Sequence, residues 1–372
     1  MRRVFLIVLA AGLLALQSLP RAQAGKLQIH FMDVGQGDGA ILIAPNGETV
    51  LFDNGVLNNC SKPLNYLNTL GITKIDYQII SHYHADHFGC TTQVLARFPL
   101  QRFSYDRGGS YPGATYNNYV QAVGTKRRTV TDGQVITLDA GSATPVTITI
   151  KSLNGNGIPT NNENDQSVSA LISFGNFRAE MGGDLSGIQT NNYEDIETSV
   201  APKVGQVDLY KAHHHCSMYS TNTAWLQTVH PRVSIVSAGN GNGYGHPTAE
   251  CIERLRLAGV KTYWTETGAG ATPEPGLDVV GGTIVVEVQA SATSTYTVRP
   301  TAAGTPTDTY QTWIASAGVP TSPAATVSYA WSKRSNLYHV ATCRFVANIS
   351  QDNLQTGTTP PAGKTLHKDC PQ

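Results

Sequence analysis

Short apolar runs, each closed by a polar or glycine-rich turn, recur through most of the chain. Residues 27–34 alternate apolar and polar side chains, as a β-strand does. Residues 40–44 and 49–52 indicate two more strands, joined by a Pro-Asn-Gly turn that is typical of a hairpin. Leucines recur at helical spacing in residues 62–71, which predicts a helix that ends at a glycine.

The same pattern continues after residue 75, with one long interruption. Residues 75–80 form an apolar run that leads into a cluster of histidines, and residues 104–133 have weak periodicity and are interpreted as a long excursion near that cluster. Two β-rich halves with helices outside them predict α+β or α/β layering. Later strands are expected at 134–138, 145–152, 167–174, 178–181, 206–210, 232–237, 260–265 and 282–298, with a short helix at about 248–258.

The first 24 residues have the pattern of a secretory signal peptide. Arg2 and Arg3 precede an apolar run from Val4 to Leu16, and an A-x-A site ends at Ala24. A membrane anchor is the alternative, but the run is shorter than the ~20 residues that span a bilayer. We expect cleavage after Ala24 and a soluble secreted or periplasmic protein, with a main domain over residues 25–298.

The charge balance changes little when this segment is removed. Without residues 1–24 the chain has 23 basic and 26 acidic residues, a net charge near −3. That balance is not the electrostatic footprint of a nucleic-acid-binding protein, so DNA or RNA binding requires a local patch.

Composition shifts again after Arg299. Residues 299–309 are rich in Thr, Ala and Pro and are predicted to form a linker. Residues 310–372 follow as a small module that contains Cys343 and Cys370. A disulfide between these two cysteines is favoured over a zinc site, because the second cysteine pair of such a site is incomplete.

Metal-ligand side chains are concentrated directly after the strand at 75–80. His82, His84, Asp86 and His87 lie there in H-x-H-x-D-H order. Imidazole and carboxylate groups are ligands for zinc, manganese and iron. One or two histidines in a loop are usually surface residues, but four potential ligands at this spacing predict a metal site.

Other clusters at strand ends extend this prediction to two ions. On an extended segment His82 and His84 point the same way, which suits one ion, whereas Asp86 and His87 reach a second. Asp184 follows two glycines that allow close backbone approach, and it is the expected bridging carboxylate. One of the histidines at 213–215 is expected to complete the second ion.

Two further residues are expected beside these ligands. Asp53, at the end of the strand 49–52, is expected to hold a ligand histidine or a bridging water from behind. Lys211 precedes the second histidine cluster and is expected to face a phosphate, with a solvated strand-end lysine as the alternative.

Together these motifs resemble the metallo-β-lactamase superfamily of hydrolases, whose fold is an αβ/βα four-layer sandwich. The His-x-His-x-Asp-His segment, the later Gly-Asp and the later His carry that resemblance. Within the superfamily the segment FMDVGQGDGA at 31–40 is similar to the opening of the ComEC-type competence domain. The same domain type is resembled by four further segments, at 51–55, 164–167, 211–217 and 244–247. The resemblance covers about residues 27–290.

The resemblance implies an exported dinuclear phosphodiesterase or nuclease that uses a metal-bound hydroxide. It implies two divalent ions, with zinc favoured and manganese as the alternative, a phosphodiester substrate such as nucleic acid, and no stable membrane insertion. His214 takes the metal by this resemblance, whereas His215 lies near the substrate. His246 is expected to contact the substrate or leaving group, and Asp86 and Lys211 complete the expected catalytic set. For His246 the alternative is a turn histidine without a role.

The chain departs from the superfamily pattern in two places. Residues 88–183 contain no histidine, although superfamily members often have one there, and Asn164 and Ser167 stand in that region. The glycines expected after the two histidine motifs are Cys90 and Cys216. These cysteines pair either with each other or with Cys60 and Cys251, and disulfides are favoured over metal ligation in an exported protein.

Two other kinds of function remain open from the sequence. A lactonase, a β-lactamase or a phosphorylcholine-type esterase uses the same scaffold. A non-catalytic surface or binding protein with a structural metal is the other alternative, although structural sites are closed by protein ligands and a site with shared carboxylates is typical of catalysis.

Overall fold

The computed structural model describes residues 25–316, 329–340, 343, 353–357 and 359–367. The predicted signal peptide over residues 1–24 and Cys370 lie outside the described residues. Within the described part, no helix is long and apolar enough to cross a membrane.

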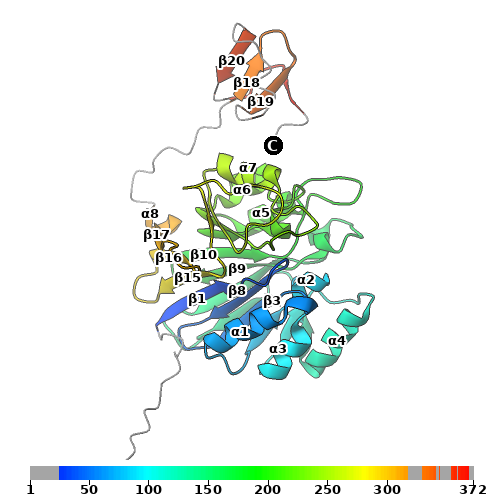
Figure 1. Cartoon of the computed structure of the whole chain (residues 1–372), viewed down its shortest axis with the longest axis vertical. Helices are drawn as coiled ribbons and strands as arrows, with labels where there is room; N and C mark the ends of the chain where they lie inside the picture. The colour runs from blue at the N-terminus through cyan, green and yellow to red at the C-terminus, as the bar shows by residue number, and fades with distance from the viewer. Residues whose placement is uncertain (1–24, 317–328, 341–342, 344–352, 358, 368–372) are drawn as a thin grey trace, which may run out of the picture.

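Two large β-sheets form the centre of the main domain (Figure 1). The first has nine strands in the order β17-β16-β15-β1-β2-β3-β4-β5-β6. Its strands are β1 (Lys26–Phe31), β2 (Gly39–Ile43), β3 (Thr49–Asn54), β4 (Tyr77–Ile79), β5 (Ser104–Asp106), β6 (Arg127–Thr129), β15 (Ile284–Gln289), β16 (Thr295–Pro300) and β17 (Asp308–Gln311).

The second sheet has eight strands in the order β14-β13-β12-β11-β10-β9-β8-β7. Pairing is parallel from β10 through β14 and antiparallel from β7 to β10. The strands are β7 (Val135–Leu138), β8 (Val146–Ser152), β9 (Ser169–Phe174), β10 (Phe177–Gly182), β11 (Leu209–Lys211), β12 (Val233–Val236), β13 (Lys261–Trp264) and β14 (Asp278–Val280).

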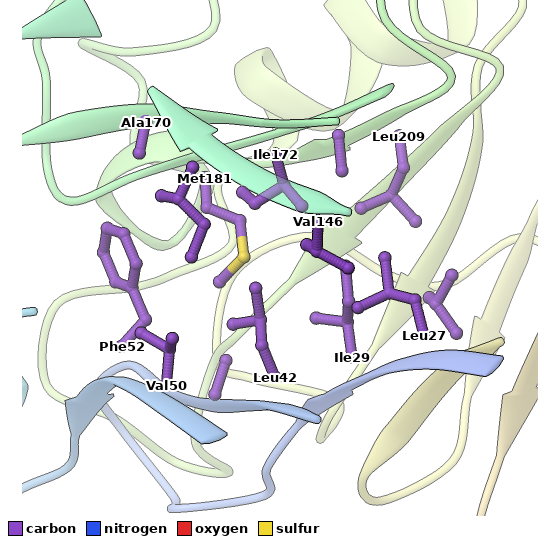
Figure 2. Close-up of a cluster of buried hydrophobic side chains, with 14 of the residues drawn as sticks. Leu27, Ile29, Leu42, Val50, Phe52, Val146, Ala170, Ile172, Met181 and Leu209 are labelled. Atoms are coloured by element: carbon purple, nitrogen blue, oxygen red, sulfur yellow. The ribbon is translucent and has the colours of Figure 1, made fainter. Parts of the chain in front are cut away.

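The core between the sheets follows from the period-2 alternation of the strands. Along β2, Leu42 faces the opposite sheet, whereas its neighbour Ile41 packs toward the helices of its own half. Figure 2 shows Leu42 and Phe52 directed toward Met181 and Ile172 of the second sheet. Full burial of such a side chain contributes about 1.5–3 kcal/mol, so this apolar layer is a main source of stability.

Helices cover the outer face of each sheet and complete four layers (Figure 1). The first sheet carries α1 (Ser61–Thr69), α2 (Ala85–Phe88), α3 (Thr91–Arg97) and α4 (Ala114–Val123). The second carries α5 (Ile196–Val204), α6 (Thr223–Val229) and α7 (Ala249–Leu257), and α8 (Trp313–Ser316) follows β17. The predicted αβ/βα sandwich is therefore confirmed.

The excursion predicted at 104–133 is more regular than expected. It contains β5, α4 and β6. The helix buries Tyr116, Tyr119 and Val123, which lie at i, i+3 and i+7 and form one apolar face. Tyrosine acts here as a core side chain, and the prediction missed the helix because it treated this segment as polar.

The linker predicted at 299–309 has a different structure. Its first residues end β16 and its last ones begin β17, and the two strands pair in the first sheet with Tyr296 opposite Tyr310. The Thr- and Pro-rich residues between them are a hairpin connection. Threonine is favoured on such half-buried strand surfaces, so a composition typical of a linker also fits an edge hairpin.

The C-terminal module forms a small sheet of its own in the order β20-β18-β19-β21. Its strands are β18 (Tyr329–Ser332), β19 (Leu337–Val340), β20 (Leu354–Gly357) and β21 (Thr365–Leu366). Cys343 is disulfide-bonded. Its expected partner, Cys370, lies outside the described residues.

Candidate metal centre

The strand-end clusters meet at one place between the two sheets. The segment from His82 to His87 follows β4 and enters α2, Asp184 follows β10, and the 3-10 turn η5 (His213–Cys216) follows β11. Parallel strands β3–β4 and β10–β11 bring these ends to one edge. The convergence that the sequence predicts from strand ends is therefore present.

Two glycines allow this close approach. At Gly183, beside Asp184, an added Cβ would lie 2.6 Å from the Cβ of Ser81. At Gly37, which has φ of +129°, an added Cβ would lie 2.2 Å from the carbonyl oxygen of Asp86. The turn at Gly37 lets the backbone N–H of Asp38 donate to that same carbonyl at 3.1 Å. Any larger residue at either position would push the loops apart.

Asp184 lies at the centre of the donor atoms. Its Oδ2 is 3.3 Å from His87 Nε2, 3.5 Å from His215 Nε2 and 3.9 Å from His82 Nε2. Two of the compact groups of ligand atoms share it, one with His82 and His87 and the other with Asp38 and His215. This position fits the bridging role that the sequence assigned to it.

The other predicted ligands surround this carboxylate. His84 Nδ1 lies 3.1 Å from His82 Nε2. Asp86 Oδ2 lies 3.2 Å from His215 Nε2 and 3.9 Å from His87 Nε2. His87 groups with both His82 and Asp86, and His84 belongs to none of the compact donor groups of the described residues, so the division into one donor set for each ion stays a prediction.

His214 and His215 both lie near Asp184, but at different distances from the other donors. Asp86, His87 and His215 place donor atoms within 4.8 Å of one another. His214 Nε2 instead lies 3.9 Å from Asp184 Oδ2 and 3.3 Å from Asn164 Nδ2. The resemblance assigned the metal to His214 and the substrate side to His215, whereas these distances favour His215 as the ligand beside Asp86 and leave His214 on the side of Asn164.

The donor set fits divalent cations. His87 Nε2, His215 Nε2 and one oxygen of Asp184 are buried without a hydrogen-bond partner among the described residues. Buried polar atoms are almost always paired, so unpartnered nitrogens and a carboxylate oxygen in one cluster fit the coordination of a divalent ion. Burial raises the pKa of Asp184, but His87 and His215 hold it well below its usual value, so this carboxyl is an anion, as a metal ligand must be.

Lys211 has a protein partner. Its side chain is buried, and its ammonium group is ion-paired with Oδ2 of Asp38. This pairing satisfies a buried charge that would otherwise be costly, and it favours a role toward Asp38 over the expected contact with a phosphate. Lys211 neutralises Asp38 and acts on the site through it.

Asp38 is the residue that the sequence interpretation missed. It is buried, with Oδ1 at 3.3 Å from His215 Nδ1 and Oδ2 at 3.7 Å from His87 Nδ1. One carboxylate thus faces a histidine from each half of the sandwich. The sequence feature that indicates Asp38 is its place in the Gln-Gly-Asp-Gly turn before β2. The sequence analysis treats this turn only as part of the resemblance to the ComEC-type domain.

Asp53 holds a candidate ligand from behind, as the sequence predicts. Its Oδ2 lies 2.9 Å from His87 Nδ1, and its Oδ1 accepts a hydrogen bond from the Ser81 backbone N–H at 2.8 Å. The side chain is fully buried. Because Asp53 accepts a hydrogen bond from Nδ1 of His87, the proton of the ring lies on Nδ1. The lone pair of Nε2 is then free to bind a metal ion.

We expect Asp53→Asn to lower metal affinity by about 10- to 100-fold, the usual cost of losing such a supporting group. Competition with a chromophoric chelator measures the change. The matched control is Asp76→Asn, which alters a buried carboxylate of the same sheet that binds Thr49 instead of a histidine. An equal loss in both variants would contradict the assigned role of Asp53.

His213 points away from the donors and anchors their turn. Its Nδ1 lies 2.8 Å from Glu197 and its Nε2 lies 3.3 Å from Glu180, all three fully buried. Burial opposes charge on the ring, but Glu180 and Glu197 raise the pKa of His213 to about 9. The next two residues have positive φ, so this buried ion-paired histidine fixes a turn that is otherwise unfavourable.

His246 lies over the second histidine cluster. Its ring centroid is 5.3 Å from that of His214 and 5.8 Å from that of His215. Burial, together with the charges of His215 and His214, lowers the pKa of His246 to about 3. Its Nδ1 has no hydrogen-bond partner among the described residues. A neutral, buried imidazole with an unpartnered nitrogen thus lies beside His214 and His215.

Both cysteines that follow the histidine motifs form disulfides, but not with each other. Cys60 pairs with Cys90, and Cys216 pairs with Cys251. The second bond joins the end of η5 to α7, and the first joins α1 to the turn after α2. Each bond therefore ties one ligand-bearing loop to a helix, within its own half of the sandwich.

We expect the double variant Cys216→Ala/Cys251→Ala to lose about 3–4 kcal/mol of unfolding free energy, since the loop it closes spans 35 residues. Urea unfolding of the variant and the wild type measures the difference. A loss below about 1 kcal/mol would show that the bond does not constrain the unfolded chain.

Comparison with known proteins agrees with this architecture. Residues 40–156 match the sequence profile of the metallo-beta-lactamase superfamily. The chain is 24% identical over 260 residues to ComE operon protein 3 of Bacillus subtilis (strain 168), covering 64% of this chain and 32% of that protein. It is 24% identical over 271 residues to competence protein ComA of Neisseria gonorrhoeae, covering 71% and 34%. The chain thus spans about a third of the length of these relatives.

Two solved structures illustrate how far the similarity to known structures extends. The metallo-beta-lactamase fold protein YhfI of Bacillus subtilis has a TM-score of 0.41 at 13% identity, covering 66% of this chain and 99% of that protein. A metallo-beta-lactamase of Cronobacter sakazakii has a TM-score of 0.35 at 16% identity, covering 48% and 75%. Residues 40–156 thus carry a match to the metallo-β-lactamase superfamily, and the chain resembles competence proteins of the ComEC type.

Proposed function

We propose that the chain is an exported, dinuclear metal-dependent phosphodiesterase whose substrate is nucleic acid. The observation that carries the proposal is the central position of Asp184, with buried, unpartnered histidine nitrogens around it. Shared carboxylates between two donor sets are typical of hydrolytic two-metal sites, with ions about 3.5–4 Å apart. The competence-protein relatives support a nucleic-acid substrate, and the two disulfides support an exported protein.

His82, His84 and Asp184 would hold one ion, and Asp86, His87, His215 and Asp184 would hold the other. Bound zinc or manganese would supply an acidic water near neutral pH and positive charge opposite the phosphoryl oxygens. The chain supplies the geometry. Asp53 fixes the ring orientation of His87, and the backbone carbonyl of Ser237 accepts from Nδ1 of His215. Asp38 lies close to both rings, and Lys211 balances its charge.

His246 has a separate role toward the substrate. Its neutral ring lies beside His214 and His215. Its free Nδ1 is available to hydrogen-bond a phosphate oxygen or the leaving oxygen of the substrate. A fixed hydrogen-bonding group at the place where charge develops lowers the barrier of phosphoryl transfer.

A substrate panel tests the proposal. Purified protein is supplied with zinc or manganese and assayed on single- and double-stranded DNA, bis-p-nitrophenyl phosphate, a lactone and nitrocefin. Hydrolysis of the phosphodiesters is expected. Turnover of the lactone or nitrocefin alone would instead identify the chain as a lactonase or β-lactamase. Tight metal binding without any hydrolysis would point to a binding protein with a structural metal.

A further inference from the structure

Five aromatic rings form a continuous row across the mouth of the metal centre, and we call it the aromatic arc. Its members in order are Tyr219, Tyr193, His214, His246 and Tyr244, and the successive ring centroids are 4.8, 5.9, 5.3 and 5.8 Å apart. The pair at each end is stacked, with interplanar angles of 27° and 19°. The middle of the arc lies against the donor atoms, because His214 Nε2 is 3.9 Å from Asp184.

The ends of the arc are open to solvent. Tyr244 is 72% exposed, the largest exposed fraction among the exposed large hydrophobic side chains of the described residues. Tyr193 and Tyr219 are partly exposed. Exposed aromatic side chains beside a polar cleft are typical of ligand recognition, because stacking on them buries apolar area on binding.

The backbone holds these rings in place before any ligand binds. Asn242 Oδ1 accepts hydrogen bonds from the N–H groups of Tyr244 and His246 at 3.1 and 3.0 Å, and its Nδ2 donates to the carbonyl of His246 at 2.6 Å. At the other end, the carbonyl of Tyr219 accepts from two backbone N–H groups at 2.8 and 3.1 Å. A preorganised platform loses little conformational entropy on binding.

The arc recognises π faces rather than charge. Within the described residues, no hydrogen bond or cation–π contact joins any of its five side chains to a Lys or Arg, and Lys211 nearby is paired with Asp38. Resting on the proposed function, we propose that unpaired nucleobases stack on the two ends of the arc while the phosphodiester between them lies at the metal centre. In a duplex the faces of the bases are already covered, so the arc selects single strands.

Two oligonucleotides separate stacking from backbone recognition. One is a short oligothymidylate, and the other is an abasic strand of equal length with the same phosphates and no bases. Binding is measured by fluorescence anisotropy with a chelator present to stop turnover, and KM is measured by cleavage of the metal-loaded protein. We expect oligothymidylate to bind at least about 5- to 100-fold more tightly than the abasic strand, the range for loss of one stacked base, and still more tightly if both ends of the arc are occupied.

Variants at Tyr244 provide the matched control. Tyr244→Ala is expected to reduce this preference by about 5-fold or more, whereas Tyr244→Phe keeps the ring and the preference. The preference is also expected to change little between about 50 and about 200 mM salt, because stacking releases no counterions. If Tyr244→Phe loses the preference as Tyr244→Ala does, the effect depends on the hydroxyl group and not on the ring. That result would overturn the proposal.

The outcomes distinguish this proposal from the proposed function. Equal affinity and equal KM for both strands, with phosphodiester hydrolysis intact, would overturn the arc and leave the phosphodiesterase standing. Tight, Tyr244-dependent binding of oligothymidylate without any hydrolysis would support the arc and reject the proposed activity. Equal binding of duplex and single-stranded DNA would also contradict the arc, since paired bases do not expose their faces.

Discussion

Asp184→Asn should abolish hydrolysis and the binding of at least one metal ion. The substitution keeps the shape of the side chain but removes the charge that lies within 3.5 Å of both His87 and His215. Loss of a supporting group costs about 10- to 100-fold, so loss of a shared ligand should exceed 100-fold in kcat/KM. Elemental analysis of the purified variant, together with its rate on bis-p-nitrophenyl phosphate, measures both effects.

The control for this variant must alter a buried acid that touches no candidate ligand. Asp208→Asn meets that need, because Asp208 binds the backbone N–H groups of Arg178 and Trp313 on the far side of the second sheet. It should reduce stability without changing metal content per folded chain. Full metal content and normal turnover in Asp184→Asn would contradict the bridging assignment.

His215→Ala should damage the site more than His214→Ala. His215 belongs to two compact donor groups, with Asp86 and His87 and with Asp38 and Asp184, whereas His214 belongs to none of those found among the described residues. We expect more than a 100-fold loss of metal affinity from His215→Ala, beyond the about 10- to 100-fold that a supporting residue costs. Chelator competition measures the metal affinity of both variants and shows which substitution lowers it more.

The opposite order would restore the assignment implied by the superfamily resemblance. That resemblance places His214 on the metal and His215 beside the substrate, so the paired variants decide between motif alignment and the contacts of the folded chain. His213→Gln is a useful third member, since His213 contacts Glu180 and Glu197 and no donor atom of the centre. It should lower stability, because it leaves buried carboxylates without their partner.

The sequence predicted the parts of the site that depend on local order. Ligands at alternate positions after an apolar run, and Asp184 after two glycines, were identifiable because strand ends place successive residues predictably. The alternation of apolar and polar residues also predicted most strands of the sandwich, because the apolar side chains of a strand must be buried. Asp53 was identified on the same basis, from its place at the end of a strand.

Contacts between residues far apart in the sequence could not be predicted from local sequence order. The Asp38–Lys211 ion pair joins residues that are 173 positions apart, and nothing local to either residue indicates its partner. Cysteine pairing depends on which loop folds over which helix, so Cys216 with Cys251 followed only from the structure. The relative positions of His214 and His215 were also beyond local reasoning, because both residues adopt positive φ in a tight turn.

Composition misled the prediction at two elements. Helix α4 was missed because two of the three residues on its buried face are tyrosines instead of aliphatic residues. The hairpin from β16 to β17 was assigned as a linker because Thr and Pro are common in both. In each case the deciding fact was a packing partner supplied by a distant part of the chain.

Metal add-back to chelated protein tests the central claim most directly. A labelled single-stranded DNA oligonucleotide is incubated with chelator-treated protein, and zinc or manganese is then titrated while cleavage is followed. The proposed site predicts no cleavage without metal, and a rate that rises and saturates at about two ions per chain. Stoichiometric metal binding without cleavage of any phosphodiester at any loading would contradict the claim that this centre is a phosphodiesterase.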